Sequence, residues 1–146
     1  MVKVAAAQIT VTNNALKNLD KIIEFIEKAA SKKVDIVCFS ESCLIHSKNK
    51  NSIKKIPFKK YIDIIKKSCG ENKIHCIFGT NLFEKGNVYN SAFFIDDKGA
   101  VIYRYNKVNL FRNEKGKVAS GKTNKVVKTK FGKIGIIICW DITYPK

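Results

Sequence analysis

A helical stretch between two short apolar runs constrains the fold of this chain more than any other feature. Residues 15–30 repeat apolar side chains at helical spacing, with lysines and glutamates between them. The flanking runs, residues 2–9 (VKVAAAQI) and 34–39 (VDIVCF), are short and rich in apolar residues, which is typical of buried strands. Two strands joined by a helix form a β-α-β unit with a parallel sheet. We therefore predict an α/β fold, with the helix starting at Asn13 or Asn14.

The rest of the chain extends this single α/β unit. Lys85-Gly86-Asn87 is typical of a hairpin turn, and residues 106–124 lose all periodicity, which predicts a long and functional loop. Beyond these, the pattern predicts a helix at 57–69 ended by Gly70, and strands at 74–79, 88–95, 101–105, 125–129 and 134–139.

The positive charge of the chain does not predict a nucleic-acid partner. The formal net charge is +16, but arginine occurs only at Arg104 and Arg112, and the lysines are scattered along the sequence. Nucleic-acid surfaces favour arginine, whose guanidinium group binds phosphate through two parallel hydrogen bonds, and they gather their charge on one face. We therefore expect no nucleic acid to bind.

The spacing of the cysteines and the hydropathy of the sequence indicate a cytoplasmic protein that has no bound metal ion and no membrane-spanning segment. The five cysteines form no C-x-x-C pair and match no zinc spacing, so we expect free thiols and no bound metal. No apolar run approaches the roughly 20 residues of a membrane span, and the N-terminus continues directly into a strand pattern instead of a signal peptide.

Three side chains of catalytic type follow predicted strands. Cys139 closes the apolar run IGIIIC, Glu41 follows the strand at 34–39, and Lys107 follows the strand at 101–105. Taken one at a time, they could be a buried structural cysteine, a solvated glutamate and a surface lysine. Because strand ends of α/β sheets line the site crevice, their shared placement favours a common site.

Co-linear motifs then carry a family resemblance along the whole chain. The sequence resembles the nitrilase superfamily of carbon-nitrogen hydrolases through short segments in the family's order. These segments are KVAAAQ at 3–8, FSE at 39–41, GT at 79–80, YNS at 89–91, YNKVNLF at 105–111, FGKIG at 131–135, ICWD at 138–141 and YP at 144–145.

The resemblance implies half of an α-β-β-α sandwich and a thiol hydrolase that needs no cofactor. By motif, Cys139 is the nucleophile, Glu41 the general base and Lys107 the oxyanion stabiliser, together with the Trp140 backbone N–H. A base and a cation suit this chemistry because a free thiol is mostly protonated at neutral pH. The implied reaction is hydrolysis of a non-peptide amide or nitrile through a thioester.

Two further positions refine this expectation. Glu114 lies seven residues after Lys107, and Gly121 lies seven after that, a spacing similar to the family's second glutamate and glycine. The resemblance therefore implies that Glu114 orients Lys107 or the substrate. Asp141 resembles the amidase branches, so an amide substrate is favoured over a nitrile. Ser40 departs from the proline that the family usually has before its glutamate.

The chain is about half as long as the family domain. We interpret residues 1–146 as the N-terminal part of one such domain, ending after the nucleophile, and expect it to form homo-oligomers or to associate with a second half. A catalytically inactive fragment or half of a split enzyme remains the alternative. A P-loop nucleotide site is less favoured: residues 116–123 (GKVASGKT) match the phosphate-binding pattern, but a β-patterned stretch follows instead of a helix.

Overall fold

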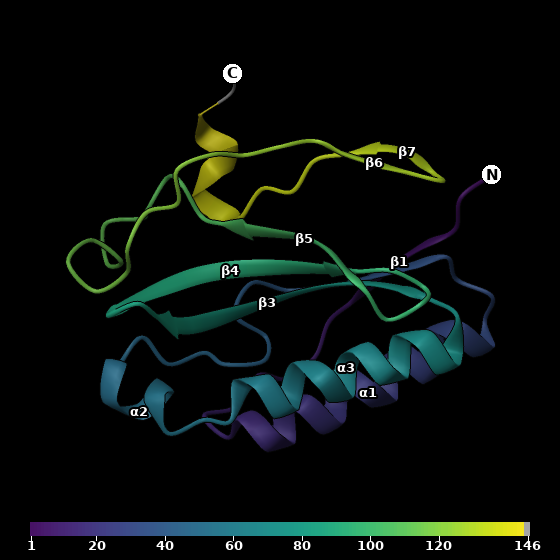
Figure 1. Cartoon of the computed structure of the whole chain (residues 1–146), viewed down its shortest axis with the longest axis horizontal. Coiled ribbons are helices and arrows are strands. Elements are labelled where there is room, and N and C mark those ends of the chain that lie inside the picture. The colour runs from purple at the N-terminus through teal and green to yellow at the C-terminus, as the bar shows by residue number, and fades with distance from the viewer. Residues whose placement is uncertain (145–146) are drawn as a thin grey trace.

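A five-stranded sheet organises the computed structural model, which describes residues 1–144 of the chain (Figure 1). The spatial order of the strands is their order in the sequence, with the first three parallel and the last three joined antiparallel. The strands are β1 (Val4–Ala7), β2 (Ile36–Phe39), β3 (His75–Glu84), β4 (Asn87–Ile95) and β5 (Val101–Asn106). The predicted α/β fold is therefore confirmed.

Two long helices cover one face of this sheet. Helices α1 (Ala15–Ser31) and α3 (Phe58–Asn72) pack side by side beneath it in Figure 1. Ile22 and Ile26 in the apolar stripe of α1 are fully buried, and burial of such a side chain stabilises the fold by roughly 1.5–3 kcal/mol. Asn14 caps α1 because its side chain accepts hydrogen bonds from two backbone N–H groups of the first turn.

The predicted helix boundaries needed two corrections. Helix α3 continues through Gly70 to Asn72, and Lys73 adopts the left-handed conformation that ends it. Gly70 was wrongly interpreted as the stop signal: a Cβ there would lie 3.3 Å from the Lys98 carbonyl oxygen, so the glycine lets helix α3 pack closely against the turn between β4 and β5. A short helix α2 (Lys50–Lys54), capped by Asn49, was not predicted.

The C-terminal third of the chain crosses the opposite face of the sheet (Figure 1). It contains the two-stranded β6 (Val127–Thr129) and β7 (Gly132–Ile134) and the 3-10 helix η1 (Cys139–Thr143). A second, smaller core lies between this segment and the sheet, with Phe94 and Tyr105 from the sheet and Ile136 and Ile138 from the segment. One face of the sheet is thus covered by helices, and the other packs against the C-terminal segment through this smaller apolar core.

The predicted buried strand at 134–139 is wrong in this structure. β7 ends at Ile134, and residues 135–138 belong to no strand ladder among residues 1–144. Ile136 and Ile138 are buried while Ile137 is 55% exposed, so the run alternates like a strand but has no hydrogen-bonded neighbour. A strand needs such a neighbour, and an apolar run alone does not supply it.

No helix within residues 1–144 is both long enough and apolar enough to cross a membrane.

Candidate active site

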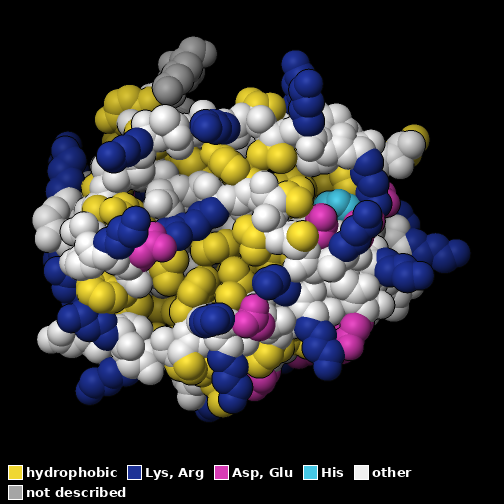
Figure 2. All heavy atoms as spheres, viewed as in Figure 1, with side chains coloured by type: hydrophobic (Ala, Val, Ile, Leu, Met, Phe, Trp, Pro, Cys, Tyr) yellow, Lys and Arg dark blue, Asp and Glu magenta, His cyan; other side chains and the backbone are white. Residues whose placement is uncertain are grey.

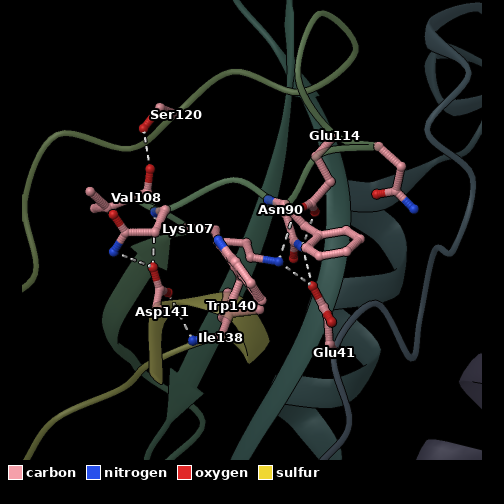
Figure 3. A network of polar contacts seen from close by, with 12 residues as sticks. Glu41, Asn90, Lys107, Val108, Glu114, Ser120, Ile138, Trp140 and Asp141 are labelled. Carbon is pink, nitrogen blue, oxygen red and sulfur yellow. Dashed lines mark hydrogen bonds and ion pairs between the residues drawn. The ribbon is translucent and has the colours of Figure 1, made fainter. Parts of the chain in front are cut away.

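Lys107 lies at the centre of a buried polar network at one edge of the sheet (Figure 3). Its Nζ donates hydrogen bonds to Glu41 Oε1 at 2.9 Å and to Glu114 Oε2 at 2.8 Å. The lysine side chain is only 1% exposed, against 3% for Glu114 and 34% for Glu41. Three of the residues predicted for the site are therefore in direct contact.

The sheet topology explains why these residues meet. Strands β2 and β5 run in the same direction, because β5 is antiparallel to β4 and β4 is antiparallel to β3. Glu41 follows β2 and Lys107 follows β5, so both residues lie at the end of the sheet where the carboxyl ends of these two strands meet. The Lys107 backbone N–H also donates to the Asn90 carbonyl oxygen at 2.9 Å, which holds its backbone beside β4.

Asn90 joins the two carboxylates, and sequence reasoning did not single it out. Its Nδ2 donates to Glu41 Oε1 at 2.6 Å and to Glu114 Oε1 at 2.9 Å, and the residue is 1% exposed. One neutral amide therefore bridges two acidic groups that would otherwise repel each other. Its only sequence signal was its place in the YNS motif at 89–91.

The ionised forms of the lysine and the buried glutamate are favoured. Burial opposes the charge on Lys107, but its hydrogen bonds and charge interactions with Glu114 and Glu41 outweigh burial and raise its pKa. Burial likewise opposes ionisation of Glu114, but hydrogen bonds from Lys107, Asn90 and the Phe111 N–H prevail and lower its pKa. Lys107 thus remains an ammonium ion held by carboxylates.

Glycine permits two backbone approaches that shape this network. A Cβ on Gly79, in β3, would lie 2.6 Å from the Ser42 backbone nitrogen and 2.8 Å from the Ser40 carbonyl oxygen. The turn that presents Glu41 can therefore pack directly on β3 only because residue 79 has no side chain.

Gly121 serves the loop on the other side of Lys107. Its N–H donates to the Lys107 carbonyl oxygen at 2.8 Å, and a Cβ there would lie 2.0 Å from the Asn106 carbonyl oxygen. The glycine whose spacing was noted in the sequence thus allows the loop after Glu114 to return against the lysine.

Cys139 differs from the other cysteines in exposure and backbone conformation. It is exposed and has a φ of +46°, a left-handed conformation unusual for a residue with a side chain. Cys43, Cys69 and Cys76 are buried. Burial raises the pKa of Cys43 to about 12 and raises that of Cys76 as well, while half-buried Cys38 is shifted the same way. The other thiols are therefore poorly placed to react.

Cys139 shares one small pocket with the polar network. The pocket has a volume of about 180 Å³ and is lined by Cys139, Glu41, Lys107 and Glu114. Its remaining lining residues are Ser42, His46, Lys48, Phe111 and Asn113. The residues that carry a thiol, two carboxylates and an ammonium group therefore line one shared space.

The two residues after Cys139 have different surroundings. Trp140 packs its ring edge-on against Phe111, with centroids 5.0 Å apart. Asp141 is buried and binds backbone and side-chain donors of two segments. In the sequence, Asp141 had indicated only a likeness to the amidase branches of the family.

The phosphate-binding pattern lacks its structural context. Residues 116–123 form turns and coil, and the next regular element is β6, not a helix. A phosphate site of this type needs the N-terminus of a following helix. Within residues 1–144, no group of three or more His, Cys, Asp or Glu side chains is placed to hold a metal ion.

A glutamate and a lysine at the ends of two sheet strands, with a cysteine from η1 lining the same pocket, are the residue types of a thiol hydrolase. The family model for carbon-nitrogen hydrolases matches residues 3–146. The chain therefore belongs to the carbon-nitrogen hydrolase family, as its motifs predicted.

Relatives in this family are named amidases and hydrolases. The chain is 29% identical to the deaminated glutathione amidase of Dictyostelium discoideum, across 99% of this chain and 57% of the relative. It is 32% identical to the citrullinase of Francisella tularensis, across 99% of this chain and 55% of the relative. The chain thus spans little more than half the length of these relatives.

Solved structures confirm the fold. A mutant of the amidase of Nesterenkonia sp. AN1, solved with acrylamide added to its active-site cysteine, superposes with a TM-score of 0.88 at 16% identity. The match covers 99% of this chain and 59% of that structure. The NitFhit protein of C. elegans gives a TM-score of 0.84 at 23% identity, covering 99% of this chain and 40% of that one.

Proposed function

We propose that this chain supplies the catalytic residues for hydrolysis of a non-peptide carbon-nitrogen bond through a Cys139 thioester. The observation that carries the proposal is the Lys107 ammonium, held between Glu41 and Glu114 in the same pocket as the exposed thiol. Family membership and the amidase names of several relatives support the reaction class.

In the first half-reaction, Glu41 acts as the general base. It takes the Cys139 proton as sulfur bonds to the carbonyl carbon, and the negative oxygen of the tetrahedral intermediate is stabilised by Lys107 and the Trp140 backbone N–H. The carbon-nitrogen bond then breaks, and the proton passes from Glu41 to the departing ammonia or amine. The acyl group stays on sulfur as a thioester.

In the second half-reaction, water replaces the amine. Glu41 removes a proton from water as the water oxygen bonds to the thioester carbon. The carbon-sulfur bond then breaks, the proton passes from Glu41 to sulfur, and the acid and the free thiol are released. Partial exposure of the Glu41 side chain, 34%, gives water access to the base. Glu114 supports the reaction by holding Lys107 in place.

An amide substrate fits this proposal better than a nitrile. Two relatives that match nearly the whole chain are amidases by name: the deaminated glutathione amidase of Dictyostelium discoideum and an omega-amidase of Saccharomyces cerevisiae. In addition, Asp141 follows Cys139-Trp140, which resembles the amidase branches of the family. We also propose a cytoplasmic location, because all five thiols are free and free thiols persist in reducing compartments.

We further propose that a second copy or a further polypeptide covers the pocket side of the molecule. Apolar side chains two and three residues from Cys139 in the sequence are exposed, Ile137 at 55% and Ile142 at 73%. Basic side chains, in contrast, are spread across the face seen in Figure 2 instead of forming one patch. This distribution supports a protein partner over a nucleic acid.

Selective alkylation of the five thiols tests the catalytic proposal. Under limiting iodoacetamide, followed by peptide mass spectrometry, Cys139 should react at least about tenfold faster than Cys43, because burial suppresses the thiolate form of Cys43. Glu41→Gln should slow labelling of Cys139, whereas Lys122→Met, which removes an exposed charge from the neighbouring loop, should not.

Three outcomes would contradict the proposal. Equal labelling of all five cysteines in the folded chain would remove the evidence for an activated nucleophile. Saturable ATP binding that Lys122→Met abolishes would favour the nucleotide-binding alternative. Selective labelling without release of ammonia from small amides, by the chain alone or with its partner, would support the inactive fragment.

A further inference from the structure

A single buried carboxylate, that of Asp141, accepts four hydrogen bonds. Its Oδ2 accepts from the Tyr105 hydroxyl at 2.7 Å and from the Ile138 backbone N–H at 2.9 Å. Its Oδ1 accepts from Asn109 twice, from the backbone N–H at 2.9 Å and from Nδ2 at 3.0 Å. The residue is 6% exposed, so these contacts replace nearly all of its hydration.

These four donors come from two separate segments of the chain; Figure 3 shows Asp141 and one of the donor residues, Ile138. Ile138 directly precedes Cys139, whereas Tyr105 and Asn109 lie two residues before and two residues after Lys107. Asp141 therefore connects the turn that presents the thiol with the segment that presents the ammonium group. Tyr105 strengthens this connection because its hydroxyl oxygen also accepts from the Val108 N–H at 3.1 Å.

The chemistry of the donors makes a carboxylate necessary at this position. All four contacts are N–H or O–H donors, and a carboxylate has two oxygens with four lone pairs to receive them. An asparagine would replace one carboxylate oxygen with an NH2 group, which is itself a donor and cannot accept the two hydrogen bonds on that side. Burial, followed by the neighbouring Asp141, raises the pKa of Tyr105, so its phenol keeps the proton that it donates.

The backbone around Cys139 needs such support. Its φ of +46° costs free energy for a residue with a side chain, and the following 3-10 helix η1 contains only five residues. The Asp141 N–H also donates to the Ile138 carbonyl oxygen at 3.0 Å, so residues 138 and 141 are bonded through both side chain and backbone. The turn is closed by these two contacts.

We propose that Asp141 is a positioning residue that fixes the position of the Cys139 thiol relative to the Lys107 ammonium group. No hydrogen bond joins it to the thiol or to the ammonium group. It acts instead through its contacts with Ile138, which precedes Cys139, and with Tyr105 and Asn109, which flank Lys107. This inference rests on the function proposed above, because it assigns to Asp141 the alignment that the reaction of Cys139 requires.

A double-mutant cycle distinguishes positioning from a general contribution to folding. Asp141→Asn is measured in the natural chain and in the Lys107→Met/Glu114→Gln background, which lacks the ammonium group without leaving Glu114 as an unpaired buried charge. The readout is the rate constant for iodoacetamide alkylation of Cys139, with thermal unfolding measured in parallel. Asp97→Asn, which removes a surface carboxylate paired with Lys130, is the matched control.

The proposal predicts strong dependence on the background. Asp141→Asn should slow Cys139 alkylation about tenfold in the natural chain, the equivalent of roughly 1.4 kcal/mol, and less than about twofold where Lys107 is absent. Asp97→Asn should change neither rate. If Asp141→Asn does not fold, Tyr105→Phe, which removes one of the four donors, should show the same dependence with a smaller effect.

Each remaining outcome has one meaning. Equal slowing by Asp141→Asn in both backgrounds, or no slowing, would overturn the positioning role. If Lys107→Met/Glu114→Gln by itself does not slow the alkylation of Cys139, the proposed function is overturned instead, because the ammonium group then has no influence on the thiol.

Discussion

Replacing Lys107 with methionine tests the energetics of the buried network directly. The substitution keeps the length and much of the volume of the side chain but removes the charge that two carboxylates share at 2.9 and 2.8 Å. Glu41 can rehydrate because its side chain is 34% exposed, whereas Glu114, at 3%, cannot. The cost therefore arises mainly from Glu114.

The expected loss can be worked from these burial values. Removing one partner of a buried ion pair costs about 3–5 kcal/mol because the other charge stays buried and unpaired. Glu114 retains hydrogen bonds from Asn90 Nδ2 and the Phe111 N–H, which places Lys107→Met near the lower end, at about 3 kcal/mol. A domain stability of roughly 5–15 kcal/mol makes this a large loss.

Urea unfolding provides the measurement. Far-ultraviolet circular dichroism follows the helices, and fluorescence of Trp140, the only tryptophan, follows the site. Adding Glu114→Gln to Lys107→Met should recover at least about 1 kcal/mol, because no buried charge is then unpaired. Lys122→Met, an exposed lysine, should change stability by less than about 0.5 kcal/mol. A cost for Lys107→Met no larger than that of Lys122→Met would refute the reasoning.

Two further predictions concern the same edge of the sheet. Since the pKa of Glu114 is lowered on folding, its stabilising contribution is complete above its ordinary value of 4.5 and disappears as the pH falls through the lower folded value. The stability difference between the natural chain and Glu114→Gln should therefore shrink over that acidic range in urea titrations, and a constant difference would contradict this. Gly79→Ala should destabilise by at least about 2 kcal/mol because its Cβ meets backbone atoms, whereas Gly135→Ala, with open space around it, should be tolerated; equal thermal shifts would contradict the packing argument.

Local patterns predicted most elements of the fold. Periodicity and capping located α1 and the hairpin at 85–87, because both depend on residues close in sequence. The prediction of a strand at 134–139 was wrong because a strand requires a hydrogen-bonded neighbouring strand, which a local pattern of residues does not reveal. Gly70 was misread because the same residue can end a helix or allow close packing inside one, and only the nearby Lys98 carbonyl distinguishes these cases.

The candidate site divides in the same way. The sequence by itself determined the positions of Glu41, Lys107 and Cys139 at the ends of apolar runs, and the family motifs added Glu114 and Trp140. Their catalytic roles stay predictions, but their placement around one pocket is a property of the structure.

Only the tertiary structure decided how these side chains are held. The bridging amide of Asn90 and the four donors around Asp141 come from segments up to 49 residues apart. Hydrogen bonds of this kind depend on direction and on distances of about 3 Å, which the folding of the sheet sets and no local pattern encodes. The sequence thus specifies which chemical groups are present, while long-range packing determines which of them touch.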